Sequence, residues 1–397
     1  MILSTKAQNI CPSLTLDITA KANAMKSEGI DVIGFGAGEP DFNTPLDIQN
    51  AAIKAIRDGK TKYTPVSGIK ELKEAVVKKF ANDNGLKYDT DQVIISTGGK
   101  QCLSNAFMAI LNPGDEVLIP APYWVSYPEL VKIAGGVPKF VETDENNGFR
   151  LDMNNLSKSL TSKTKAIVIN SPNNPTGSVY SKADLEQIAE FAKENDLIII
   201  SDEMYEKLIY DNIEYTSIAS LSQDAYERTI VVSGVSKTYA MTGWRIGYAA
   251  ASKEIVKLMG RVQSHTTSNP NSIAQYASLE ALNGPQNEVQ KMVHEFKTRR
   301  DYMVKKINSI SHISCNNPEG AFYVMVNISE LIGKSIENAA IKNSMDFCKL
   351  LLQHEKVAAV PGAAFGIENY LRLSYATSMD NITNGLDRLG NFVMELH

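Results

Sequence analysis

The sequence lacks the features of several protein classes. Basic residues show no excess, since 40 Lys and Arg stand against 45 Asp and Glu, which gives a formal net charge of -5. A nucleic-acid-binding role is therefore not expected, because phosphate contacts need a basic surface. No apolar run approaches the length of about 20 residues that crosses a membrane. The N-terminal segment 1–13 has no apolar core of the secretory type, so we expect neither a membrane span nor a signal peptide.

Cysteine and histidine are both scarce. The cysteines form no C-x-x-C pair, and they are Cys11, Cys102, Cys315 and Cys348. This pattern favours reduced thiols and a cytoplasmic protein. The five histidines have no metal-ligand spacing, and the glycine-rich segment 34–40 does not match the G-x-G-x-x-G pattern of dinucleotide-binding proteins. Neither a metal centre nor a dinucleotide site is expected.

Short apolar runs alternate with helix-like segments along the first three quarters of the chain. Strands are expected at 92–97, 115–120, 165–171, 197–202 and 229–234. Apolar residues recur at helical spacing in 47–58, 69–82 and 183–195. Buried strands that alternate with helices predict an α/β fold with a mainly parallel sheet.

The C-terminal part has a different pattern. A long polar helix is expected at 287–310, followed by a strand at 321–328, a helix at 345–354 and a strand at 370–376. This order predicts a smaller α+β unit. A chain of 397 residues also exceeds the usual size of one hydrophobic core. We therefore expect a large domain at 46–290 and a smaller domain made of 1–45 and 291–397.

Polar residues follow three of the predicted strands directly. These segments are 170–177 (NSPNNPTG), 201–205 (SDEMY) and 233–238 (SGVSKT), and the third is soon followed by 243–247 (GWRIG). In open α/β sheets, ligands bind beyond the carboxyl ends of the strands. The segment 96–100 (STGGK) opens a predicted helix, whose free N–H groups suit a phosphate. The pattern indicates a carboxylate, a lysine, an arginine and an asparagine near one phosphate site.

These residues also have ordinary structural interpretations. Lys237 could be a solvated lysine, Asp202 a helix N-cap, and Asn174 part of a plain Asn-Pro turn. Tyr205 could be a half-buried tyrosine and Arg245 a member of a surface salt bridge. From the residues alone, these alternatives stay open.

The motifs taken together resemble one family. SPNNPTG (171–177), SDEMYE (201–206) and SGVSKTYAMTGWRIGY (233–248) occur in this order, and the similarity extends from 12–22 to 371–378. The chain resembles class I pyridoxal-phosphate aminotransferases of fold type I, closest to the bacterial-type aspartate aminotransferases. The resemblance implies a seven-stranded-type sheet in the large domain and pyridoxal 5'-phosphate as cofactor. It also implies amino acids and 2-oxo acids as substrates.

The resemblance assigns a role to each cofactor residue. Lys237 is expected to form a Schiff base with the cofactor aldehyde and to move the proton at the substrate Cα. Asp202 would keep the pyridine nitrogen protonated, which makes the ring an electron sink. Tyr205 and Asn174 would donate hydrogen bonds to the ring oxygen. Trp124 would stack on the ring, and a plain core tryptophan is the alternative.

The cofactor phosphate has its own expected contacts. Ser236 and the planar guanidinium of Arg245 would bind it, together with the backbone N–H groups of Gly99 and Lys100. Tyr63 resembles a tyrosine that reaches the phosphate of a neighbouring subunit, which implies a homodimer. From the sequence alone, Tyr63 would be a loop tyrosine.

Substrate contacts also follow from the resemblance. Arg372 would bind the α-carboxylate with two parallel hydrogen bonds. Gly38 would let the substrate approach the backbone, unless it is a simple turn glycine. Lys100 would attract the distal carboxylate, unless it points to solvent. Trp124 and Asn174 are expected to contact the substrate as well.

We therefore expect an aspartate aminotransferase, which transfers the amino group of L-aspartate to 2-oxoglutarate in ping-pong half-reactions. The alternative is a class I enzyme with another donor specificity, aromatic, alanine or broad. Relatives that accept prephenate carry a basic residue before the Pro-Ser pair at 12–13, where this chain has Cys11, so prephenate is not expected. A DNA-binding regulator built on this fold is disfavoured because basic residues show no excess.

Overall fold

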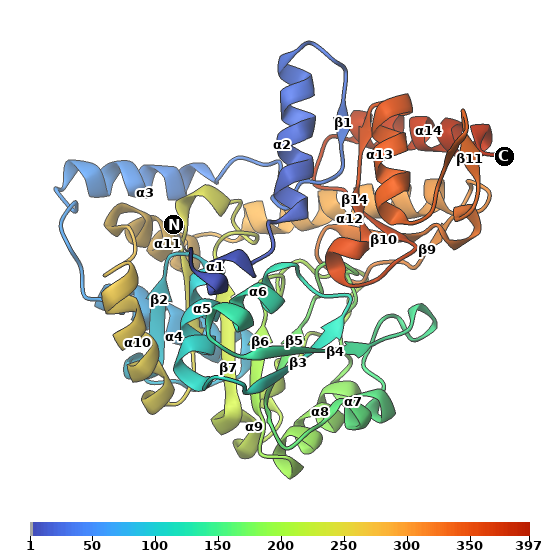
Figure 1. Cartoon of the computed structure of the whole chain (residues 1–397). Coiled ribbons are helices and arrows are strands. Elements are labelled where there is room, and N and C mark those ends of the chain that lie inside the picture. Colours follow the sequence, from blue (N-terminus) through green and yellow to red (C-terminus); the bar gives the residue numbers. More distant parts are fainter. Residues whose placement is uncertain (1–2) are drawn as a thin grey trace.

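A seven-stranded sheet is the largest element of the computed structural model, which describes residues 3–397 (Figure 1). Its strands lie in the order β2-β8-β7-β6-β5-β3-β4. Their bounds are β2 Val93–Ser96, β3 Glu116–Ala121, β4 Val137–Glu142, β5 Thr164–Asn170, β6 Ile198–Asp202, β7 Thr229–Gly234 and β8 Gly247–Ala250. Neighbouring strands are parallel except for β8, which is antiparallel to both β2 and β7. The predicted α/β fold with a mainly parallel sheet is confirmed.

Helices cover both faces of this sheet. Strand β2 shows the consequence, because Val93 and Ile95 pack into one buried cluster and Ile94, between them, packs into another. Successive side chains of a strand point to opposite faces, so a strand buried on both faces is apolar throughout. The helices of this part are α3 Leu46–Arg57, α4 Lys70–Asn84, α5 Gly99–Ile110, α6 Ser126–Ile133, α7 Met153–Ser159, α8 Lys182–Glu194, α9 Gln223–Arg228, α10 Lys253–Thr266 and α11 Ser272–Asn283.

A second, antiparallel sheet follows in the C-terminal part. Its order is β14-β15-β10-β9, with β9 Ser314–Cys315, β10 Tyr323–Asn327, β14 Val360–Pro361 and β15 Tyr370–Ser374. The helices beside it are α12 Asn287–Ile307, α13 Ser344–Glu355 and α14 Met379–Glu395. Strands β11 Ser335–Ile336 and β12 Ala339–Ala340 pair antiparallel to form a two-stranded ribbon.

The N-terminal segment lies against the C-terminal elements. Strand β1 Ile33–Gly34 pairs in parallel with β13 Val357–Ala358, and helix α2 Leu14–Ser27 contacts β1, β13 and β14 (Figure 1). The short helix α1 Thr5–Gln8 precedes it. This pairing supports a smaller unit built from both ends of the chain, with boundaries at 46 and 290 that we keep as a proposal. Within residues 3–397, no helix is both long and apolar enough to cross a membrane.

Two strands of the large sheet were not expected from the sequence. Strand β4 lies at the sheet edge and leaves Val137 42 % and Phe140 48 % exposed, so it has no continuous apolar run. Strand β8 has only four residues, GYAA, and its small side chains carry little strand signal. Gly247 is needed there, because a Cβ would lie 2.4 Å from the backbone nitrogen of Gly99.

Candidate active site

One cavity of about 370 Å³ lies at the carboxyl ends of the parallel strands. Asp202 is the last residue of β6, Ser236 and Lys237 follow the end of β7, and Arg372 comes from β15 of the second sheet. Every site residue expected from the sequence except Tyr63 lines this cavity, namely Gly38, Gly99, Lys100, Trp124, Asn174, Asp202, Tyr205, Ser236, Lys237, Arg245 and Arg372. The predicted convergence of the strand ends is therefore confirmed in geometry, while the role of each residue stays a proposal.

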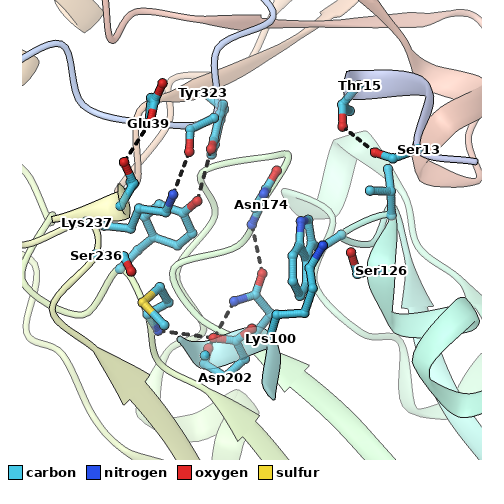
Figure 2. Close-up of a pocket in the computed structure, with 18 of the residues that line it drawn as sticks. Ser13, Thr15, Glu39, Lys100, Ser126, Asn174, Asp202, Ser236, Lys237 and Tyr323 are labelled. Carbon is cyan, nitrogen blue, oxygen red and sulfur yellow. Dashed lines mark hydrogen bonds between the residues drawn. The ribbon is translucent and has the colours of Figure 1, made fainter. Parts of the chain in front are cut away.

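The amine of Lys237 lies in a largely desolvated position. Its Nζ donates a hydrogen bond to the carbonyl oxygen of Gly38 at 2.5 Å (Figure 2). Burial lowers the pKa of Lys237 to about 8, and Glu39 opposes this shift while Arg245 adds to it. A lysine with this pKa has a substantial neutral fraction near physiological pH, which is the form that attacks a carbonyl.

Asp202 presents a buried carboxylate to the same cavity. Its Oδ2 accepts a hydrogen bond from the Tyr127 hydroxyl at 2.7 Å, and its Oδ1 accepts one from the backbone N–H of Met204 at 3.2 Å. Burial raises the pKa of Asp202 to about 6, although the Tyr127 and Met204 hydrogen bonds oppose the shift. A cationic N–H group placed beside this carboxylate would restore its ionised form.

Two tyrosines link the two sheets at the cavity wall. The hydroxyl of Tyr205 lies 3.0 Å from that of Tyr323, the first residue of β10 (Figure 2). Burial, followed by the neighbouring Tyr323, holds the pKa of Tyr205 well above its usual value. Both phenols therefore stay protonated and can donate hydrogen bonds.

An anion cradle is formed where α5 begins. The helix starts at Gly99, and Gly98 before it has φ +81°. A Cβ on Gly98 would lie 2.4 Å from the Arg245 guanidinium, so only glycine lets the arginine approach the helix N-terminus. Arg245 itself has φ +57°, and its Nη1 donates to the carbonyl oxygen of Thr242 at 2.8 Å. Free N–H groups, a guanidinium and the Ser236 hydroxyl together suit a phosphate.

Arg372 is a buried cation with unused bonding capacity. Its Nη1 donates to Asn174 Oδ1 at 3.1 Å and its Nη2 to the Gly36 carbonyl oxygen at 3.0 Å. Its Nε, also buried, has no hydrogen-bond partner among residues 3–397. The guanidinium lies 4.3 Å from the ring centroid of Tyr323 and 4.9 Å from that of Phe365. Burial lowers the pKa of Arg372. An anion bound in the cavity would stabilise this buried positive charge.

Lys100 is a second cation beside the cavity. Its Nζ lies 5.1 Å from the ring centroid of Trp124. Burial lowers the pKa of Lys100, and Arg245 lowers it further. Ser13 and Thr15 from the N-terminal segment line the same cavity, with their hydroxyl oxygens 2.9 Å apart (Figure 2).

Sequence reasoning missed several of these residues. Tyr323 lies in a continuous apolar run, which gives no sign of the face that a side chain occupies. Ser13 and Thr15 are far in sequence from the strand ends, and Tyr127 lies within helix α6 after β3, so only the fold reveals their place. Tyr63 is the expected residue that lies elsewhere, since it is 92 % exposed and does not line the cavity.

Fold and site together define an enzyme that holds an anionic cofactor at the carboxyl edge of a parallel sheet and offers it a lysine amine. The family model described as aminotransferase class I and II matches residues 30–389. An aspartate aminotransferase from Bacillus subtilis (strain 168) is 48 % identical over 99 % of both chains. An aspartate/prephenate aminotransferase from Nitrosomonas europaea is 46 % identical over 99 % of this chain and 100 % of the relative.

The similarity extends to a solved structure. The crystal structure of an aspartate aminotransferase from Rhizobium meliloti superposes with a TM-score of 0.96 at 44 % identity and covers 100 % of each chain. The chain belongs to the class I and II aminotransferase family, and its cofactor is pyridoxal 5'-phosphate.

The cavity residues fit this cofactor. Lys237 supplies an amine of lowered pKa, and Asp202 supplies a buried carboxylate whose pKa is raised by burial. At the start of α5, Arg245 lies close to Gly98 and supplies the positive charge that suits a phosphate. Trp124 provides an aromatic surface at the cavity wall.

Proposed function

We propose that this protein is an aspartate aminotransferase, which transfers the amino group of L-aspartate to 2-oxoglutarate and gives oxaloacetate and L-glutamate. One observation carries the proposal, namely that two cationic side chains, Arg372 and Lys100, line the cavity that also contains Lys237. Aspartate, glutamate and their oxo acids each carry two carboxylates, so two cations match these substrates. The names of the Bacillus subtilis and Rhizobium meliloti relatives agree with this proposal.

Each of these cavity residues has a separate role in the proposed reaction. Arg372 binds the α-carboxylate with its planar fork, and Lys100 attracts the distal carboxylate. When bound, pyridoxal 5'-phosphate supplies an electron-withdrawing ring that stabilises negative charge at the substrate Cα. Lys237, as a neutral amine, would take the proton from the substrate Cα and deliver it to the cofactor carbon that receives the amino group. Asp202 would keep the ring nitrogen protonated.

Three further residues keep the reactants in place. Tyr205 and Asn174 would donate hydrogen bonds to the ring oxygen, and Trp124 would cover the ring. Asn174 also accepts a hydrogen bond from Arg372, so the α-carboxylate receptor is connected to a cofactor contact. Closure of the smaller unit, which carries Arg372, would exclude water from the site.

Another donor specificity is the second candidate. The cavity also contains the apolar side chains of Leu16 and Leu103, which suit aromatic or alanine donors. The Nitrosomonas europaea relative is named for prephenate as well as aspartate. Cys11 carries no cationic side chain, and its backbone N–H donates to Glu129 Oε2 at 3.0 Å, which argues against binding a second carboxylate there.

We also propose a cytoplasmic homodimer. Helix α3 exposes Leu46 (69 %), Ile53 (44 %) and Ile56 (54 %), which a partner would cover. Tyr63 follows this helix, and in a dimer it would reach the phosphate site of the other copy. Light scattering tests the dimer. A Tyr63→Phe protein should bind the cofactor more weakly with the dimer intact, and a monomeric wild-type protein would contradict the proposal.

A donor panel tests the substrate directly. Purified protein is mixed with 2-oxoglutarate and either aspartate, phenylalanine or alanine, and kcat/KM is measured for each. We expect aspartate to give the highest value. A higher value for phenylalanine or alanine would assign the chain to the second candidate.

A further inference from the structure

A second group of ionisable side chains lies behind the turn that carries Asp202 and Tyr205, and the reaction described above makes no use of it. Its charged members are Lys79, Glu203 and Glu206. Glu203 and Glu206 are 0 % and 6 % exposed, and the Lys79 side chain is 8 % exposed. Buried charges are costly unless they are paired and hydrogen-bonded, so a group of three calls for an explanation.

Helix α4 binds Glu206 through two side chains. Lys79 Nζ donates to Glu206 Oε1 and, at 2.7 Å, to Asn84 Oδ1. Asn84 Nδ2 donates to Glu206 Oε2 at 2.8 Å and lies 3.4 Å from Glu203 Oε2. Lys79 and Asn84 lie on the same helix, five residues apart, so a single rigid element clamps the turn.

Both strands beside the cofactor site are tied to the same group. The Ser233 hydroxyl of β7 donates to Glu206 Oε1 at 2.9 Å. The Ser201 hydroxyl of β6 and the Ser217 hydroxyl donate to Glu203 Oε1 at 2.9 Å and 2.6 Å. Ser233 stands shortly before Lys237 in the chain. The buried group thus connects the segments that provide the carboxylate and the lysine of the active site.

The turn presents two opposite faces. Asp202, Met204 and Tyr205 line the cofactor cavity, whereas Glu203 and Glu206 are absent from its lining. A shift of the Glu203 or Glu206 side chain would therefore move the backbone that carries the cavity residues. The backbone N–H of Glu203 donates to Val232 O at 2.7 Å, which adds a further attachment to β7.

The two buried carboxyl groups differ in pKa, and Lys79 also lies 3.9 Å from the partly exposed carboxylate of Asp83. Burial and the neighbouring Glu206 raise the pKa of Glu203. Burial alone would raise the pKa of Glu206, but the charge of Lys79 and the hydrogen bonds from Lys79, Asn84 and Ser233 together outweigh it, and the pKa is lowered. The group therefore contains a Lys79–Glu206 ion pair, and of the two carboxyl groups Glu203 is the one that holds a proton more readily.

We propose that Lys79, Glu203 and Glu206 are positioning residues, which fix Asp202 and Tyr205 against the cofactor from the rear of the turn. The proposal rests on the proposed function for the roles of Asp202 and Tyr205. The three residues do not line the cavity. They act on the chemical step, because displacement of a reacting group by about 1 Å can slow a reaction roughly hundredfold.

Glu206→Gln is the central test, because it keeps the shape of the side chain and removes the partner charge of Lys79. We expect kcat for aspartate to fall about tenfold, with KM changed less than about twofold, since Arg372 and Lys100 are untouched. The visible circular dichroism of the bound cofactor, per unit absorbance, should change with it. Glu186→Gln, on the exposed face of α8, is the matched control and should behave as wild type.

A conservative pair of variants separates positioning from simple packing. Glu203→Gln keeps the acceptor for Ser201 and Ser217, whereas Glu203→Ala leaves both hydroxyls unpaired. We expect Gln to retain most of the kcat and circular dichroism signal that Ala loses. If Glu206→Gln fails to fold, the double variant Lys79→Met/Glu206→Gln removes both charges together and is measured in the same way.

One result would overturn the proposal. If these variants unfold at lower temperature but keep wild-type kcat and wild-type visible circular dichroism well below that temperature, the group only stabilises the fold. The dichroism measurement needs no substrate. A wild-type protein that binds the cofactor but does not react with aspartate would refute the proposed function. The circular dichroism of the variants could still be compared with that of the wild type.

Discussion

Replacement of Arg372 with lysine keeps a positive charge in the cavity but removes the planar fork. Arg372 is 2 % exposed, and its Nη1 and Nη2 already donate to Asn174 Oδ1 at 3.1 Å and to Gly36 O at 3.0 Å. Each of these nitrogens carries a second hydrogen, and Nε has no hydrogen-bond partner in the part of the chain that the structure describes. A carboxylate from the cavity can therefore accept two parallel bonds. A single ammonium group offers only a point charge in place of this fork.

The expected loss follows from one missing bond. A hydrogen bond to a charged group contributes about 1.5–3 kcal/mol. At about 1.4 kcal/mol per factor of ten, Arg372→Lys should lower kcat/KM roughly 10- to 150-fold.

The assay uses 2-oxoglutarate as the acceptor and compares two donors, aspartate and alanine. Both carry the α-carboxylate, so Arg372→Lys should lower kcat/KM by a similar factor for each. A loss confined to aspartate would show that Arg372 binds the distal carboxylate, and the assignment of the two cations would be wrong. Unchanged values for both donors would remove Arg372 from substrate binding altogether.

Three other outcomes follow from the site. Lys100→Met should lower kcat/KM for aspartate about tenfold and leave alanine nearly unchanged, since only aspartate has a distal carboxylate; equal losses for both donors would contradict this. Asp202→Asn keeps a hydrogen-bond acceptor for Tyr127 but loses the negative charge, so steady-state kinetics should show kcat reduced about ten- to hundredfold. Free Lys237 has a pKa of about 8, so its reactive neutral form increases as the pH rises towards 8. Stopped-flow mixing of apoprotein with cofactor should therefore show a rate of cofactor attachment that increases up to about pH 8 and levels off above it. A rate independent of pH would argue against the buried amine.

The strand ends were predictable from the sequence because each polar segment follows a short apolar run directly. Asp202 and Lys237 stand at such ends, and parallel strands bring their carboxyl ends to one edge. The predicted helices at 47–58 and 183–195 also agree with α3 and α8 within a residue or so at each end. Local patterns of this kind depend on the residue itself and its near neighbours.

Contacts between distant segments were not predictable in the same way. Tyr323 meets Tyr205 across 118 positions of the chain, and Lys79 meets Glu206 across 127. The acidic residues of DEMYE look like ordinary first-turn residues of a helix, and nothing nearby in the sequence shows that α4 supplies a buried cation. Strand β4 was missed because an exposed edge strand has no continuous apolar signal.

The most direct test of the central claim is the visible absorbance of the purified protein before and after addition of aspartate alone. We expect a yellow wild-type protein whose absorbance bleaches with aspartate and returns with 2-oxoglutarate, and a Lys237→Ala protein that shows no catalytic turnover. A Lys237→Ala protein that transaminates at the wild-type rate would contradict the account, as would a wild-type protein that binds no pyridoxal 5'-phosphate.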